Sequence, residues 1–308
     1  MLAFSTCWNN SKHNEGEAMI DEILEMGFSN IELSHGMTIT KYPGIKKAYK
    51  ENKFVCSGVH NYFPAPLEVL IDAPDAFEYT SNKGYDRNKV MKLTKQSLEV
   101  AAEFDAKYLV LHMGSVPMRH DRWSNLLTEM AAEENKESSK FLKLKQKFVT
   151  KRAKYTKKYF ARAMEALELL SSFAKEAGVP LAVESRSRYE DVPSEPEMRV
   201  LQEHFKDDPW IGYWHDFGHV QLKHNIDLLD HHEWLKEMEP YLIGCHLHDV
   251  QYPAKDHRVP FAGTLDYKDL LQFIDPDKPL VWEISRSQTK QAILDSLTKW
   301  KNDFPLYT

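Results

Sequence analysis

The sequence predicts an α/β fold: a single (β/α)8 TIM barrel over residues 1–308, with a helical, charged insertion after the fourth strand at about 114–153. Three observations lead to this prediction. Eight short apolar segments alternate with helical patterns, no linker or second core interrupts them, and eight parallel strands are the number that closes a barrel. The length of 308 residues and the hydrophobic content of 42% suffice for one such barrel with a substantial core.

The strands are short apolar runs, and segments of helical periodicity separate them. We expect strands at residues 2–6, 30–33, 54–60, 107–112, 180–184, 210–214, 242–248 and 279–284. Helices are expected at residues 15–26, 45–51, 88–104, 226–238, 268–273 and 288–301, with a further long helix that runs up to residue 177. Gly178 and Pro180 end this long helix just before the fifth strand.

The insertion at 114–153 is the irregular part of the chain. It contains the segment 118–123, Met-Arg-His-Asp-Arg-Trp, and a highly charged stretch follows. A charge run of this kind is typical of a solvated helix face. The insertion is either a lid over the site or an oligomer contact, so a homo-oligomer is a possible assembly.

Composition restricts the partners and the location. The net charge of −6 gives no general attraction to nucleic acid, and no window is apolar enough to cross a bilayer. No signal peptide is recognisable at the N-terminus. Cys7, Cys56 and Cys245 form no CxxC motif and fall inside expected strands. They resemble small buried residues in a reducing compartment, which predicts a cytoplasmic protein.

Six consecutive strands end in side chains that can bind a metal ion. They are His60, His112, Glu184, Asp216, His246 with His248, and Glu283. A single histidine or glutamate at such a place is usually a structural hydrogen-bonding group, and Asp216 could simply cap the following helix. In a TIM barrel, however, these strand ends converge on one mouth. So many carboxylates and imidazoles would repel or desolvate one another without a cation, which predicts a metal site.

Three carboxylates and one imidazole form a hard, oxygen-rich ligand set. Glu184, Asp216 and Glu283 supply the oxygens, and His246 or His248 supplies the nitrogen. Mn²⁺ is the first expectation, with Co²⁺, Mg²⁺ or Zn²⁺ as alternatives. No cysteine is among the ligands, which argues against a structural zinc.

The pattern resembles the xylose isomerase-like TIM-barrel superfamily, which contains sugar phosphate and keto-sugar isomerases, epimerases and dehydratases and also the endonuclease IV-type repair enzymes. The resemblance runs from Gly-Phe-Ser-Asn-Ile-Glu-Leu at 27–33 to Trp-Glu-Ile at 282–284. It implies that Glu184, Asp216, a strand-seven histidine and Glu283 hold one divalent metal, and that the two glutamates are acid/base catalysts. His219 resembles the family's substrate-contacting histidine.

The choice of the strand-seven ligand stays open. The stretch 246–249, His-Leu-His-Asp, resembles the His-Leu-x-Asp pattern of endonuclease IV, which makes His246 the ligand. The His-x-His pattern of the ketose 3-epimerases makes it His248 instead. The direct match to His-Leu-x-Asp favours His246.

The resemblance to the repair enzymes implies a second function, a zinc-dependent AP endonuclease. Their further zinc ligands resemble His60, His112, His219 and Asp256. Arg258 stands where those enzymes have an imidazole, and a guanidinium cannot ligate a metal. This departure and the net charge of −6 argue against a nuclease, whereas the basic stretch 143–158 keeps the alternative open.

The expected reaction is isomerisation or epimerisation of a sugar, keto-sugar or related polyol. A metal polarises a carbonyl and the adjacent hydroxyl, and Glu184 and Glu283 remove and return a carbon-bound proton through a metal-bound enediolate. A keto-inositol-type dehydratase would use the same residues. The residues expected to contact the substrate are His60, His112, His219, Arg186, Arg258 and Arg286. For each arginine, a salt bridge within the ring of strand ends is the alternative.

Overall fold

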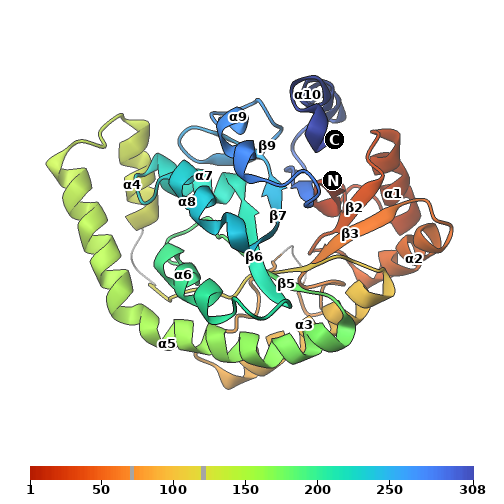
Figure 1. Ribbon diagram of the computed structural model, residues 1–308, viewed down its shortest axis with the longest axis horizontal. Coiled ribbons are helices and arrows are strands. Elements are labelled where there is room, and N and C mark those ends of the chain that lie inside the picture. Colours follow the sequence, from red (N-terminus) through yellow and green to blue (C-terminus); the bar gives the residue numbers. More distant parts are fainter. Residues whose placement is uncertain (70–72, 119–122) are drawn as a thin grey trace.

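The computed structural model describes residues 1–69, 73–118 and 123–308, so residues 119–122 of the charged segment lie outside the described part. Eight parallel strands close into a barrel in the order β1-β10-β7-β6-β5-β4-β3-β2 (Figure 1). They are β1 Leu2–Ser5, β2 Asn30–Leu33, β3 Val55–His60, β4 Leu109–Leu111, β5 Leu181–Glu184, β6 Ile211–Asp216, β7 Leu242–Leu247 and β10 Leu280–Trp282. The predicted (β/α)8 barrel is confirmed, and each expected strand contributes to it.

Helices connect the strands and surround the barrel (Figure 1). They are α1 Gly16–Glu25, α2 Tyr42–Lys50, α3 Gly84–Glu103, α4 Trp123–Ala132, α5 Ser139–Ala177, α6 Glu195–His204, α7 Phe217–Asn225, α8 His231–Met238, α9 Tyr267–Leu270 and α10 Lys290–Asp303. The expected helix at 226–238 is wrong in its first half. The chain forms α7 directly after β6, and the Asp230 side chain starts α8 by accepting a hydrogen bond from the Glu233 N–H at 3.0 Å.

Two further local expectations need correction. Helix α6 was not expected, although Ser194 and Glu197 form a capping box at its start, which is a recognisable sequence signal. Cys7 lies in the short 3-10 helix η1, Thr6–Trp8, and not inside a strand, because the chain turns immediately after β1. Cys56 and Cys245 are buried in strands as predicted.

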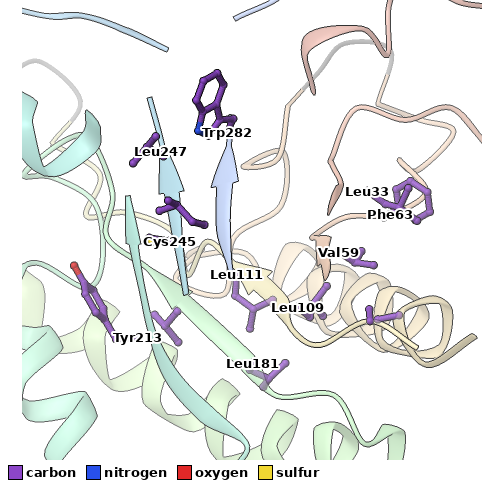
Figure 2. Close-up of a cluster of buried hydrophobic side chains, with 14 of the residues drawn as sticks. Leu33, Val59, Phe63, Leu109, Leu111, Leu181, Tyr213, Cys245, Leu247 and Trp282 are labelled. Carbon is purple, nitrogen blue, oxygen red and sulfur yellow. The ribbon is translucent and has the colours of Figure 1, made fainter. Parts of the chain in front are cut away.

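Side chains alternate between the two faces of each strand and form two apolar layers. One layer points outward to the helices, and Figure 2 labels ten residues of this buried cluster, among them Leu109, Leu181 and Tyr213. A smaller inner cluster contains Ala3, Tyr108, Val110, Ala182, Trp214 and Val281. Because side chains on one face of a strand recur every second residue, the next inward positions toward the mouth are polar. On β5, β6 and β10 these positions are Glu184, Asp216 and Glu283.

The insertion after β4 is helical, as predicted. Helix α4 and the first half of α5 pack through a separate apolar cluster that includes Leu127, Phe141 and Phe148. The two segments extend beyond the barrel on one side (Figure 1). The second half of α5 buries Leu167 and Leu170 against the barrel, and the helix ends at Gly178, whose φ of 71° is the left-handed conformation favoured by glycine.

Candidate metal centre

Four side chains meet at the mouth of the barrel. Glu184, Asp216, His246 and Glu283 each offer one ligand atom, and these four atoms lie within 4.8 Å of one another. Nδ1 of His246 lies 2.7 Å from Oε1 of Glu184, 3.4 Å from Oε2 of Glu283 and 3.8 Å from Oδ2 of Asp216. All four residues are buried. The structure therefore brings together the four side chains that the strand ends predicted, from β5, β6, β7 and the residue after β10.

His248 lies beside this group and makes a different set of contacts. Its Nδ1 accepts a hydrogen bond from the backbone N–H of His257 at 2.9 Å. Its other ring nitrogen therefore carries the hydrogen, and Nε2–H donates to Oδ2 of Asp216 at 3.2 Å. This geometry makes His248 a residue that orients Asp216, and it favours His246 as the strand-seven ligand.

Glu32, on β2, is a site residue that the sequence analysis missed. The carboxylate is fully buried, with Oε2 3.0 Å from Nε2 of His246, and it accepts a hydrogen bond from the Tyr108 hydroxyl at 3.1 Å. A carboxylate on one imidazole nitrogen fixes the ring so that the other nitrogen faces the metal position. The signal was present in the sequence, because Glu32 is an acidic residue between the apolar Ile31 and Leu33 of a strand.

Neighbouring imidazoles favour the ionised form of the three carboxylates. Burial alone would raise the pKa of Glu184, but His112 and His246 hold it well below its usual range. Burial also opposes ionisation of Glu283, whose pKa is nevertheless lowered strongly by His246 and His257. Burial likewise opposes ionisation of Asp216, but His219 and His248 lower its pKa. Buried anions at this density require compensating positive charge.

The donor set fits a divalent cation. Three carboxylates supply oxygen ligands, and one imidazole, held by Glu32, supplies nitrogen, which is a set suited to Mn²⁺, Mg²⁺, Co²⁺ or Zn²⁺. A cation would supply the positive charge that the buried carboxylates require. Glu184, Asp216, His246 and Glu283 are therefore the residues that could hold it.

A second group of side chains lies on the β3–β5 side of Glu184. Nε2 of His112 lies 2.6 Å from Oε2 of Glu184, and Nε2 of His60 lies 3.9 Å from the same oxygen. Arg186 places one guanidinium nitrogen 3.4 Å from Glu184 and another 2.7 Å from Asp75. Asp75, in the loop after β3, was not predicted, because no periodic pattern marks its position. Arg186 thus forms the salt bridges that were the alternative to substrate contact.

A third group contains His219, His248 and His257. Asp216 caps α7 by accepting a hydrogen bond from the backbone N–H of His219 at 2.6 Å, and the His219 side chain is buried, not on the surface. His257 arrives on a hairpin formed by β8 Asp249–Gln251 and β9 Lys255–Arg258. Its ring stacks on His248 at 4.0 Å between centroids.

The hairpin changes how residues 256–258 are interpreted. In the sequence, the guanidinium of Arg258 stands where an imidazole would be needed. The structure instead places the imidazole of the preceding residue in the site, with Nε2 of His257 3.5 Å from Oε2 of Glu283. An imidazole is therefore present despite Arg258, whose own Nε is buried without a hydrogen-bond partner among the described residues.

A cavity of about 680 Å³ opens beside Glu283. The loops after β1, β2, β3 and β10 and the β8–β9 hairpin form its walls, and His35, His257 and Arg286 are among the lining residues. The His35 ring lies 4.6 Å from the ring of His60, in an edge-on arrangement. Of the arginines expected to contact substrate, Arg286 is one that lines this cavity.

Residues 20–302 match the family described as xylose isomerase-like TIM barrel, and the chain belongs to this family. Among solved structures, it is similar to a D-tagatose 3-epimerase-like protein, with 14% identity over 99% of this chain and 97% of that one and a TM-score of 0.70. The 3-keto-D-glucoside 4-epimerase of E. coli is 18% identical over 98% of both chains, with a TM-score of 0.67.

A third similar structure is described as a probable 3-DHS dehydratase from Bacillus anthracis, with 13% identity over 98% of both chains and a TM-score of 0.65. At these identities the similarity establishes the fold. None of the curated proteins compared with the chain matched it. In the described part of the chain, no helix combines the length and the apolar composition needed to cross a bilayer.

Proposed function

We propose that this protein is a divalent-metal-dependent isomerase or epimerase that acts on a sugar, keto-sugar or related polyol. One observation carries the proposal. Two buried carboxylates, Glu184 and Glu283, lie 2.7 and 3.4 Å from Nδ1 of the His246 imidazole, and Glu283 lines a cavity large enough for a small carbohydrate. Proton transfer at a carbon next to a carbonyl requires such a pair, one group to remove the proton and one to return it.

Glu184, Asp216, His246 and Glu283 would hold the cation, with Mn²⁺ as the first choice. When bound, it would polarise a substrate carbonyl and the adjacent hydroxyl, which makes the neighbouring C–H bond more acidic. His248 and Glu32 would keep Asp216 and His246 oriented.

The two glutamates differ in what surrounds them, which suggests different roles. Glu283 lines the cavity, so its carboxylate can reach a bound substrate and accept a carbon-bound proton. Glu184 contacts His112 at 2.6 Å. Burial and Arg186 lower the pKa of His112, but Asp75 and Glu184 outweigh them and raise it, which favours the protonated imidazole beside Glu184. We assign proton removal to Glu283 and proton return to the Glu184–His112 pair.

Two structurally similar proteins are named as sugar epimerases, which supports a carbohydrate substrate. The dehydratase neighbour supports the related alternative, in which the same carboxylates remove a proton and a hydroxyl then leaves. Both reactions begin with removal of a proton from the carbon next to the carbonyl, so one experiment tests both.

The test is turnover of a panel of keto-sugars in D₂O with Mn²⁺, followed by NMR. Deuterium should appear on a carbon next to the carbonyl, and Glu283→Gln should abolish this exchange even where metal is still bound. Conversion without carbon-bound deuterium would contradict the proposal, because it would indicate hydride transfer or hydrolysis.

A zinc-dependent AP endonuclease is the second candidate, and a specific observation supports it. The described residues contain four neighbouring groups of side chains that could each hold a metal ion. They are His60 with His112 and Glu184; Glu184 with Asp216, His246 and Glu283; His219 with His248 and His257; and His35 with His60 and Glu283. Since His257 supplies an imidazole, Arg258 is a weaker argument against a third metal than the sequence alone indicated.

Metal counting and DNA incision separate the two candidates. We expect one metal per chain and no significant cutting of an abasic-site duplex at low salt with zinc supplied. Arg258→His provides the comparison, because it adds the imidazole that the repair enzymes have there. Three zinc ions per chain and efficient incision by the wild type would overturn the isomerase proposal in favour of the nuclease.

A further inference from the structure

A buried lysine that takes no part in the proposed proton transfer lines the same cavity as Glu283. Lys41 ends the 3-10 helix η2, Ile39–Lys41, immediately before α2, and only 7% of its surface is exposed. Its ammonium group donates a hydrogen bond to the backbone carbonyl of Asn10. Within the described residues, no carboxylate lies at ion-pair distance from it, and burial lowers its pKa.

The other charges around the cavity do not neutralise Lys41. Its acidic lining residues, Asp256 and Glu283, both contact His257, at 3.3 and 3.5 Å. Arg286 adds a second, exposed cation to the lining, and it has no carboxylate partner in the described part of the chain. The cavity therefore has an acidic end, compensated by His257, and two cations for which the described residues supply no carboxylate partner.

A buried ammonium with a single carbonyl partner is costly unless another anion or acceptor completes its hydrogen bonds. Among the described residues, two of its three donors have no protein acceptor and are available to a ligand. A volume of about 680 Å³ lies within the range of small-molecule sites, which leaves room for one ligand to reach from Glu283 to Lys41.

We propose that Lys41, with Arg286, forms a subsite for an anionic group on the substrate. The substrate is then a keto-sugar with a carboxylate or a phosphate remote from the carbonyl, which sits at the Glu283 end. This inference rests on the proposed isomerase or epimerase function, and it specifies the substrate class for that site. Neutral keto-sugars of the same length lack the group that Lys41 would pair with.

The experiment is calorimetric binding of three matched probes to the Mn²⁺-loaded protein. D-fructose, D-fructuronate and D-fructose 6-phosphate share a ketose chain and differ only in whether the terminal group is a hydroxymethyl, a carboxylate or a phosphate ester. At least one anionic probe should bind tenfold or more tightly than D-fructose. Lys41→Met should remove most of this preference and change D-fructose affinity less than twofold.

Matched variants separate the subsite from general charge effects. Lys50→Met removes the same charge at the exposed end of α2 and should leave the preference intact. Lys41→Arg should retain part of it. Circular dichroism and thermal melting check that Lys41→Met is folded. Arg286→Gln, at an exposed position, should weaken anion binding on its own and provides the test if Lys41→Met does not fold.

The binding results test the anion subsite separately from the proposed isomerase or epimerase reaction. A larger preference for D-fructuronate assigns a carboxylate, and a larger one for D-fructose 6-phosphate assigns a phosphate. Equal affinities, no binding of either anionic probe, or a preference that survives both Lys41→Met and Arg286→Gln would overturn the subsite. Repeating the titrations on metal-free protein measures the subsite without the metal, so the anion preference is measurable even if the metal-dependent reaction proves wrong.

Discussion

Nε2 of His246 on β7 lies 3.0 Å from the carboxylate of Glu32 on β2, although the two residues are 214 positions apart in the sequence. Both side chains are fully buried. This contact crosses the interior of the barrel and leaves Nδ1 of His246 facing Glu184, Asp216 and Glu283. The carboxylate therefore determines which imidazole nitrogen is available at the candidate metal position.

Glu32→Gln should lower Mn²⁺ affinity about 10- to 100-fold, because the ring would lose its charged orienting partner. Titration calorimetry on the metal-free protein measures the effect. Tyr108→Phe is the matched control, since it removes only the hydroxyl that donates to Glu32 at 3.1 Å and should have a smaller effect. Unchanged affinity in Glu32→Gln would show that this contact does not support metal binding.

Asp216→Asn and Glu184→Gln should each lower metal occupancy sharply while the barrel stays folded. In Asp216→Asn the amide oxygen of the new side chain can still accept the hydrogen bond that starts α7, so the helix cap survives the change. Metal content after purification and far-ultraviolet circular dichroism measure the two effects separately. Full occupancy in both variants would exclude these residues as ligands.

His246→Gln should abolish tight metal binding, whereas His248→Gln should reduce it by roughly tenfold. The difference follows from the contacts of His248, whose two ring nitrogens bond to the His257 backbone and to Asp216. Competition with a fluorescent Mn²⁺ chelator gives both affinities. The reverse order would make His248 the ligand, as in the His-x-His pattern.

Arg152→Met should destabilise the protein by about 3–5 kcal/mol, because it would leave the buried Glu197 carboxylate without its partner. The guanidinium forms two hydrogen bonds of 2.8 Å to this carboxylate and thereby joins α5 to α6. Urea unfolding measures the change, with the exposed Lys154→Met as the control on the same helix. Adding Glu197→Gln should recover part of the loss, and a stability unchanged by Arg152→Met would contradict the argument.

Stability should decrease as the pH falls below 6.5, partly because of His231. Burial, with His215 nearby, lowers the pKa of His231 well below 6.5, so the native side chain stays neutral while the unfolded chain takes up a proton. The free energy of unfolding then falls by up to about 1.4 kcal/mol per pH unit for this group.

Urea unfolding at several values between pH 6.5 and about pH 5 measures this slope. His231→Gln should make it shallower by up to one proton, whereas the exposed His204→Gln on α6 should leave it as in the wild type. An identical slope in His231→Gln would show that this histidine is already protonated in the native protein.

The sequence by itself determined the fold and the strand ends that carry the site. Strand and helix periods are local properties of the chain, so eight strands and their order along the chain were readable without the structure. Glu184, Asp216 and Glu283 were recognisable because ligand-type residues recur at the ends of consecutive strands, and these ends meet at one mouth in a TIM barrel. The end of the long helix at Gly178 was recognisable from the local sequence in the same way.

Only the tertiary structure decided how these residues face one another. The choice between His246 and His248 depends on the register that places Asp216 beside His246, and Glu32 joins the site only when the barrel closes. Asp75 arrives on a loop, Lys41 on a single 3-10 turn and His257 on a hairpin, and the paths of these segments follow no sequence period. Contacts between distant segments depend on side-chain packing and on closure of the barrel. Local sequence patterns do not specify this geometry.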